Sequence, residues 1–365
     1  MSTLSCGIVG LPNVGKSTLF NALLKKVQAG AANFPFCTIE PNVGIVDVPD
    51  KRLQILSDIS KSKKLLPATM TFVDIAGLVK GASTGEGLGN KFLANIRETD
   101  AIVHVVRCFE NTQVIHVEGK VDPIADIEVI NLELILADLQ MTENSLQKIE
   151  RQAKGNKELV PTLEALKKIQ AHLNENHPVR SLSLTKEEQE ILNPYHFITA
   201  KKVIYAANLS EDDILSYDNP HLKAVQAYAS EEKSQVIPFC AKLEEELSQL
   251  SEEEAKEYLD TLGLKEPGLD RLIKISYETL SLITFLTTGE QETRAWTVPA
   301  GATAPEAAGK IHSDIQKGFI RAEVVTFDDM VKYAGRMGAK EAGKTRFEGK
   351  EYIVQDGDVV LFFHS

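Results

Sequence analysis

The sequence predicts an α/β protein in which helices cover a parallel sheet, with a helical segment inserted in it and a small α+β domain following it. Three observations indicate this. Apolar runs alternate with helical patterns over the first 120 residues or so, as in strand–helix–strand units. A helical stripe begins near Ile127, and short strands dominate from about Ser281. The length of 365 residues suits two or three such domains.

The α/β domain is expected to span residues 1–126 and 201–280. Apolar, β-branched runs bounded by polar turns predict its strands, and periodic apolar positions predict its helices. His104 lies inside one such strand, so we expect it in the core. The expected strands are 6–10, 70–77, 101–106, 201–210 and 235–242, and the expected helices are 16–26, about 90–97 and 243–260.

The insertion is expected to be a helical or coiled-coil hairpin over residues 127–200. Apolar residues from Ile127 to Met141 recur at steps of three and four, which is the period of one helix face. The same pattern returns between Leu163 and Leu173 after a polar turn. Thr185 followed by Glu188 predicts a capping box at the start of a further helix.

The last domain is expected to be a small α+β unit over residues 281–365. Segments 294–299, 319–327 and 351–363 have the composition of short strands. One helix is expected between them, opening at Thr303–Pro305 and closing near Gly318. The Asp356-Gly357 pair predicts a tight turn.

Composition narrows the function classes. The net charge of −12 argues against a protein that coats nucleic acid, so DNA is not an expected partner. A local basic patch over 332–350 is a candidate RNA contact, although a solvated charged face would look the same. No run of about 18 apolar residues and no signal-peptide pattern is present, which predicts a cytoplasmic protein without a membrane span. The four scattered cysteines predict neither a zinc site nor disulfides, and only Cys37 lies in a candidate switch loop.

Residues 10–17 match the GxxxxGK[ST] phosphate-binding loop, and they lie between a predicted strand and a predicted helix, as the motif requires. The glycines let backbone N–H groups turn toward a β-phosphate, and the helix N-terminus adds its dipole. Lys16 is expected to act on the β- and γ-phosphate oxygens, and Ser17 to bind Mg²⁺. The expected phosphate-binding residues are Gly10, Asn13, Val14, Gly15, Lys16, Ser17 and Thr18.

Two further segments complete the expected triphosphate site. Asp74 and Gly77 form a DxxG motif at a strand end, which supplies a carboxylate on the metal side and an N–H for the γ-phosphate. Thr38, in a Pro-rich loop, is a candidate switch threonine, so the expected Mg²⁺ ligands are Ser17, Thr38 and Asp74. Leu78 stands where many GTPases carry a glutamine, so either hydrolysis is slow or another group positions the water.

The base-reading segment departs from the guanine-specific NKxD pattern. Asn208 is followed by Leu209, and Glu211 replaces the aspartate that would accept two guanine N–H bonds. An Asn amide can pair with adenine N6 and N7, which favours ATP over GTP, although guanine specificity stays open. Cys240 and Ala241 occupy the place of the loop that usually touches the base.

On these residues the chain resembles the YchF family of Obg-like ATPases. The resemblance rests on segments 7–23, 32–44, 72–102, 104–111, 208–211, 301–305, 317–324 and 354–359. It implies a TRAFAC-class P-loop NTPase (G) domain, a helical insert and a C-terminal TGS domain with a ubiquitin-like β-grasp fold. It also implies ATP hydrolysis with GTP used less well, a hydrophobic residue at Leu78 and a catalytic histidine at the position of His116.

The same resemblance implies association with the ribosome, through its large subunit, and a nucleotide-dependent switch. Two alternatives stay open from the residues alone. The protein could be a true GTPase that keeps guanine specificity. It could also be a nucleotide-gated binding module in which hydrolysis is incidental. The presence of Leu78 where many GTPases carry a glutamine would suit this alternative.

Overall fold

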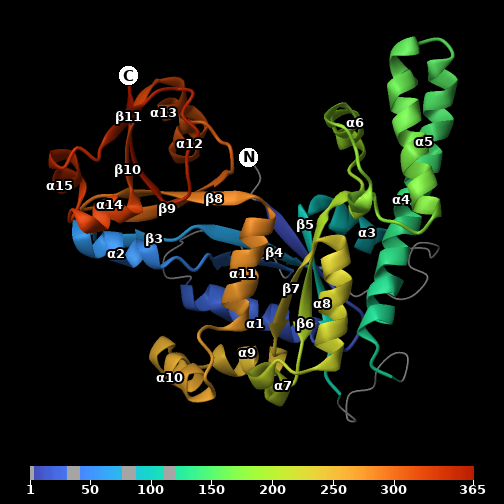
Figure 1. Ribbon diagram of the computed structural model, residues 1–365, viewed down its shortest axis with the longest axis horizontal. Helices are drawn as coiled ribbons and strands as arrows, with labels where there is room; N and C mark the ends of the chain where they lie inside the picture. Colours follow the sequence, from blue (N-terminus) through green and yellow to red (C-terminus); the bar gives the residue numbers. More distant parts are fainter. Residues whose placement is uncertain (1–3, 31–41, 76–87, 111–119) are drawn as a thin grey trace. The chain divides into compact units, whose positions relative to one another are not determined.

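The computed structural model describes residues 4–30, 42–75, 88–110 and 120–365 (Figure 1). The chain divides into two compact units. The first contains residues 1–26, 39–44 and 71–272, and the second contains 27–38, 45–70 and 273–365. None of the helices in the described ranges is long and apolar enough to cross a membrane. The α/β class predicted from the sequence is confirmed.

The first unit is built on a sheet of order β2-β4-β1-β5-β6-β7. The pairs of β1 with β4 and β5, of β5 with β6, and of β6 with β7 are all parallel. The central strands β1 and β5 are buried along their whole length, which explains their continuous apolar sequence. The strands are β1 (Ser5–Val9), β2 (Val43–Asp47), β4 (Thr69–Asp74), β5 (Ala101–Arg107), β6 (Lys202–Asn208) and β7 (Gln235–Phe239).

Helices connect these strands. α8 packs on β6 and β7, and the long helix α4 packs on β5 and α8. The acidic helices expected over 243–260 are present as two helices, because α9 ends at Leu247 and Ser251 caps a new one through a capping box with Glu254. The helices are α1 (Lys16–Gly30), α3 (Leu88–Glu98), α4 (Pro123–Ala153), α7 (Glu211–Ser216), α8 (Pro220–Glu232), α9 (Ala241–Leu247), α10 (Glu252–Leu262) and α11 (Gly268–Thr279).

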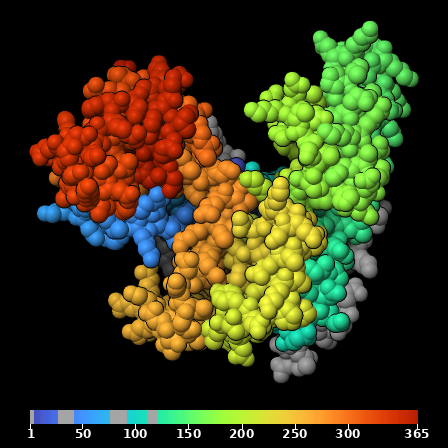
Figure 2. All heavy atoms as spheres, in the orientation of Figure 1, coloured from blue at the N-terminus to red at the C-terminus, as the bar shows by residue number. Residues whose placement is uncertain are grey.

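The inserted segment forms a helical arm. It consists of α4, α5 (Val160–Asn174) and α6 (Lys186–Leu192), and the distal parts of α4 and α5 run side by side in the green region of Figures 1 and 2. Leu166 and Ile169, from the predicted stripe of α5, pack in one cluster with Leu146 of α4, which lies beyond the stripe predicted for that helix. The capping box of Thr185 and Glu188 is confirmed, with hydrogen bonds in both directions.

Hydrogen bonds at the base of the arm join it to the sheet. The carboxylate of Asp138, on α4 and fully buried, accepts bonds from the N–H of Ile198 at 3.0 Å, from the N–H of Thr199 at 2.8 Å and from the Thr199 hydroxyl at 2.7 Å. Just beyond, the ammonium group of Lys201 donates to the carbonyls of Ile96 at 2.9 Å and Arg97 at 2.8 Å, near the end of α3. The segment by which the chain leaves the arm is therefore bonded both to α4 and to the end of α3.

The second unit is built on a mixed sheet of order β11-β10-β12-β8-β9-β3. Ala322, Val324 and Val360 pack on one face with α12, and α2 packs against β8 and β9 together with α14 (Figure 1). The strands are β3 (Lys64–Leu66), β8 (Leu282–Thr288), β9 (Glu292–Pro299), β10 (Phe319–Thr326), β11 (Arg346–Glu348) and β12 (Asp358–His364). The helices are α2 (Lys51–Ser60), α12 (Ala304–Ile311), α13 (Ser313–Lys317), α14 (Phe327–Lys332) and α15 (Arg336–Glu341).

Two local features of this unit differ from the sequence prediction. The single helix expected between Thr303 and Gly318 is two helices, because His312 adopts an extended conformation and caps α13 through its ring nitrogen. α2 and β3, which lie between β2 and β4 in the sequence, belong to this unit, since β3 pairs in parallel with β9 from Lys64 to Leu66. The expected turn at Asp356-Gly357 is present, with φ of 84° at the glycine.

Candidate nucleotide-binding site

The phosphate-binding loop connects β1 to α1. Asn13 and Gly15 have φ of 63° and 98°, in the left-handed region that turns successive N–H groups to one side of the loop. A Cβ atom on Gly15 would lie 2.2 Å from the side-chain nitrogen of Asn208, and one on Gly10 would lie 2.9 Å from the carbonyl oxygen of Val105. The loop thus needs glycine at both ends because of close contacts, and at Gly15 because of its backbone conformation as well.

Lys16 and Asp74 meet at the carboxyl end of the sheet. Asp74 is the last residue of β4, and its carboxylate accepts a hydrogen bond from the ammonium group of Lys16 at the start of α1. Their side chains are 10% and 21% exposed, so the ion pair is only partly screened by water. The side chain of Ser17 is exposed beside them, and Thr18 is half-buried. A cation, a carboxylate and a hydroxyl therefore gather at one helix N-terminus.

The side chain of Asn208 connects the phosphate-binding loop to the start of α9. It ends β6 and is 4% exposed. Its amide nitrogen donates to the carbonyl of Val14 at 2.9 Å, and its amide oxygen accepts from the N–H of Ala241 at 2.9 Å. The side chain expected to pair with adenine is thus largely used in holding the phosphate-binding loop against the start of α9.

A cavity of about 480 Å³ lies beside the phosphate-binding loop. The N-termini of α7 and α9 open onto it. Leu209 lines it with a side chain that is otherwise buried, and the Glu211 carboxylate binds the Lys242 ammonium at 2.9 Å on its rim. The structure thereby brings together most of the residues predicted for the phosphates and the base. The lining residues are Asn13, Gly15, Thr18, Phe109, Glu110, Asn208, Leu209, Ser210, Glu211, Cys240, Ala241, Lys242 and Glu245.

Sequence reasoning missed Phe109 and Glu110 in this cavity. Phe109 follows β5, and the guanidinium of the buried Arg107 lies 4.6 Å from the centre of its ring. The Arg107 Nε also donates to the Phe109 carbonyl at 3.1 Å. Both residues could have been found from the rule that ligands bind at the carboxyl ends of parallel strands.

Several predicted site residues lie outside the described residues. Thr38, Gly77 and His116 are among them, as are Leu78 and Cys37. Their proposed roles therefore stay predictions. In the described part of the chain, no group of three or more His, Cys, Asp or Glu side chains is arranged to hold a metal ion.

Other ionisable groups near β5 are structural. His104 is 2% exposed, and burial together with Arg180 lowers its pKa to about 3, so it is a neutral core residue, as expected from its place in a strand. Burial raises the pKa of the Cys108 thiol to about 12. Burial also raises the pKa of Cys240, which makes this thiol a small apolar wall of the cavity.

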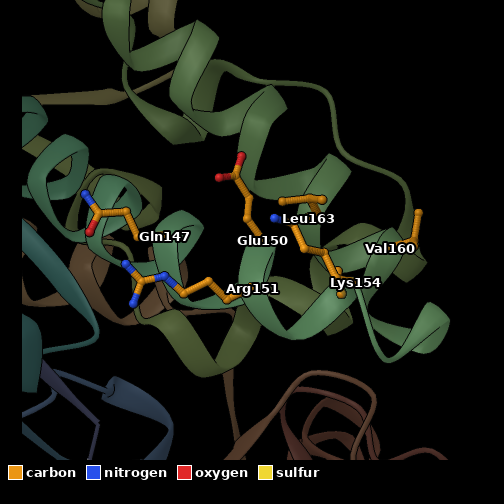
Figure 3. A pocket seen from close by; sticks show the side chains of 7 residues that line it. Gln147, Glu150, Arg151, Lys154, Val160 and Leu163 are labelled. Atoms are coloured by element: carbon orange, nitrogen blue, oxygen red, sulfur yellow. The ribbon is translucent and has the colours of Figure 1, made fainter.

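A second cavity, of about 580 Å³, lies on the helical arm (Figure 3). Glu150 and Arg151 line it from α4, Lys154 lines it just after the end of α4, and Val160 and Leu163 line it from α5. It has no glycine-rich loop and no convergent N–H groups, which a triphosphate would need. Its volume is larger than that of the cavity beside the P-loop, but the chemistry of nucleotide binding is found only at the latter within the described ranges.

Comparisons with known proteins match both halves of the chain. A family model described as a 50S ribosome-binding GTPase matches residues 5–153. A second model, named for the C-terminal part of YchF GTPases and described as a protein of unknown function, matches residues 282–364.

Full-length relatives are similar to the whole chain. A protein of Haemophilus influenzae named ribosome-binding ATPase YchF is 56% identical over 358 residues, which are 98% of each chain. A protein of Escherichia coli O157:H7 with the same name is 56% identical over 361 residues, 99% of each chain. The solved structure of the Schizosaccharomyces pombe YchF GTPase is 39% identical and covers 100% of this chain and 98% of its own, with a TM-score of 0.90.

Proposed function

Because the chain belongs to the YchF family, we propose that it is a Mg²⁺-dependent P-loop nucleoside triphosphatase that hydrolyses ATP, and GTP less well, to the diphosphate and phosphate. One observation carries the proposal. The loop at residues 10–17 opens α1 beside a cavity of about 480 Å³, so that one ligand could reach both. The bacterial relatives are named ATPases, which supports ATP as the substrate.

Phosphate binding is proposed for the loop N–H groups and for Lys16. The positive φ values at Asn13 and Gly15 and the N-terminus of α1 favour an anion at this point. Lys16 contacts the single carboxylate of Asp74, and a triphosphate would offer the same ammonium group more negative charge. We propose that Lys16 then leaves Asp74 for the β- and γ-phosphate oxygens.

The donor set fits Mg²⁺. Ser17 and Asp74 offer a hydroxyl and a carboxylate oxygen beside the phosphate loop, and Thr38 is proposed as a further ligand. Mg²⁺ takes oxygen ligands and is usually held by one or two side chains plus phosphates, which suits a site without a dedicated cage. When bound, Mg²⁺ would neutralise charge on the phosphates.

Base selection is proposed for Leu209, Glu211 and the Cys240–Ala241 turn. Asn208 keeps one N–H and one lone pair beyond its two protein partners, so its main proposed role is to position these neighbours. GTP is the alternative substrate. The Schizosaccharomyces pombe relative is named a GTPase, and the carboxylate of Glu211 on the cavity rim could accept hydrogen bonds from guanine.

Catalysis is proposed for Lys16, Gly77 and His116. Lys16 would stabilise charge on the phosphates, the N–H of Gly77 would bind the γ-phosphate, and His116 would act on the attacking water in place of the missing glutamine at Leu78. The protein would then act as a switch whose state depends on which nucleotide is bound.

Ribosome association is proposed from the names of the relatives. An RNA contact through residues 332–350 would suit it, since six cations stand there against two acids in a chain of net charge −12. If His116→Ala abolished hydrolysis while ribosome binding and release stayed normal, a binding module with incidental hydrolysis would be the better description.

Calorimetric titration of nucleotide-free protein with ATP and with GTP, in Mg²⁺ buffer, tests the proposal. We expect ATP to bind at least tenfold more tightly, a difference of about 1.4 kcal/mol. Lys16→Ala should weaken binding or turnover, and Lys25→Ala, on the same helix, should leave both unchanged. Wild-type affinity and turnover in Lys16→Ala would refute the phosphate site, and equal or tighter GTP binding would make the protein a GTPase.

A further inference from the structure

Two walls of the cavity beside the phosphate-binding loop come from segments that follow different strands. Phe109 and Glu110 follow the end of β5, and we call them the β5 wall. Ser210 and Glu211 follow the end of β6 at the start of α7, and we call them the α7 wall. Because both walls line one cavity, a base bound there would be within reach of both. A group that sets their separation would therefore act on base binding without touching the base.

The buried side chain of Asn219 joins the two walls. Asn219 directly precedes α8 and is 5% exposed. Its amide nitrogen donates to the carbonyl of Cys108, the residue before Phe109, at 3.0 Å, and to a carboxylate oxygen of Asp213 at 3.0 Å. The same Asp213 oxygen accepts a hydrogen bond from the Ser210 hydroxyl at 2.7 Å. One amide thus connects the β5 wall to the α7 wall.

Helix capping alone does not explain an asparagine at this position. The Asn219 amide oxygen accepts a hydrogen bond from the N–H of Leu222 at 2.9 Å and so caps α8. A serine or an aspartate would cap the helix as well. Among the common cap residues, only asparagine adds two side-chain N–H donors to that acceptor. The neighbours also fix the orientation of the amide, because the reverse orientation would turn its oxygen toward a carbonyl and a carboxylate.

The two linked segments have further hydrogen bonds of their own. The N–H of Cys108 donates to the Asn208 carbonyl at 2.9 Å, and the Cys108 side chain is buried. In the other segment, the Ser210 hydroxyl accepts from the N–H of Asp213 at 3.1 Å. Each wall is therefore ordered locally, and the Asn219 amide lies between them. A change at Asn219 would move one ordered segment relative to the other.

We propose that Asn219 is a positioning residue for the nucleotide base, which sets the separation of the β5 and α7 walls through Cys108 and Asp213. The inference rests on the proposed nucleotide binding and deepens it, since it makes the spacing of two walls a determinant of base binding. The phosphates depend on Asn219 much less, because the three hydrogen bonds of its side chain go to Cys108, Asp213 and Leu222.

Calorimetry of the full-length protein with ATP and with tripolyphosphate, which carries no base, tests the proposal in Mg²⁺ buffer. Asn219→Asp keeps the helix cap but turns an acceptor toward two acceptors, so it should weaken ATP binding about tenfold. Tripolyphosphate should bind this variant as tightly as wild type. The kcat at saturating ATP should stay near the wild-type value, because the phosphate site is unchanged.

A second substitution should rescue the first. Asp213→Asn, added to Asn219→Asp, again places an N–H opposite a carboxylate, so the double variant should regain at least about threefold in ATP affinity. Asn219→Ser keeps a cap, removes both donors and adds no charge, and it should also lower ATP affinity while sparing tripolyphosphate. Asn156→Asp, at the N-cap of Lys157–Leu159 in the arm, is the matched control and should bind both ligands like wild type. Thermal melts check that the variants fold.

The outcomes separate this inference from the proposed function. Wild-type ATP affinity in both Asn219 variants would overturn the positioning role, as would a double variant that binds ATP no better than Asn219→Asp. Equal weakening of ATP and tripolyphosphate would also overturn it, since Asn219 would then support the whole site as a structural residue. If wild type bound neither ATP nor tripolyphosphate, the proposed function itself would fail, and the inference with it.

Discussion

Replacing Asn208 with alanine separates two roles for this residue. Its amide joins the carbonyl of Val14 to the N–H of Ala241, both at 2.9 Å, at a position that is 4% exposed. If the amide mainly positions its neighbours, Asn208→Ala should weaken ATP and GTP binding by the same factor. If it reads the base, the ratio of the two affinities should change.

The magnitude follows from the two hydrogen bonds. Each contributes about 1 kcal/mol net, so their loss removes about 2 kcal/mol. If the whole loss falls on the nucleotide-bound state, both dissociation constants rise about 30-fold. If it falls on folding instead, the melting temperature drops by roughly 4–8 °C.

Calorimetry with both nucleotides, together with thermal melts, measures each of these quantities. Glu211→Gln is the comparison, because it changes a rim carboxylate while the bridge of Asn208 stays in place. We expect Glu211→Gln to shift the ATP-to-GTP ratio and Asn208→Ala to preserve it. An Asn208→Ala variant that loses only ATP affinity would refute the positioning role.

Three further outcomes are expected. Burial raises the pKa of Glu244 from 4.5 to about 7, so its contribution to stability is complete below about pH 4.5 and is lost as the pH rises through 7. The unfolding free energy of wild type should therefore fall by about 3 kcal/mol relative to Glu244→Gln between about pH 5 and 8, and parallel pH curves in urea melts would contradict this. Asp138→Ala removes three hydrogen bonds to a buried carboxylate and should lower the unfolding free energy by about 3–5 kcal/mol, with the exposed Glu190→Ala as a control near zero. A thiol reagent at about pH 8 should label at most one cysteine quickly in the native protein and four in denaturant, and a second fast thiol would contradict the burial of Cys6, Cys108 and Cys240.

The fold could be predicted where signals are local. The apolar run at β1, the loop after it and the stripe on α4 each carry their own period or motif, and all three were placed within a few residues. The second unit was harder because its sheet takes β3 from far upstream. Lys64–Leu66 is only three residues long and half-exposed, so nothing local indicates that it pairs with β9.

In the candidate site, too, local motifs were predictive and contacts between distant segments were not. Lys16 and Asp74 were predicted from motifs, and the structure brings them into contact. The motif also pointed to Asn208, but its two hydrogen bonds depend on the approach of Val14 and Ala241, which no spacing rule contains. In the basic segment, Arg336 and Arg346 looked available in the sequence and are held by acids from other strands.

The pairing of β3 with β9 has a consequence for how the chain is made. Roughly 200 residues separate the two strands, so β3 leaves the ribosomal exit tunnel long before its partner exists. At a synthesis rate of roughly 5–20 residues per second, roughly 10–40 s would pass between the synthesis of β3 and that of β9. During this interval Leu53 and Leu56, which α2 buries in the finished protein, lack the sheet of β8 and β9. A nascent chain of this protein therefore exposes an apolar helix while the residues of the first unit are being synthesised, which makes it a candidate client for chaperones that act during translation.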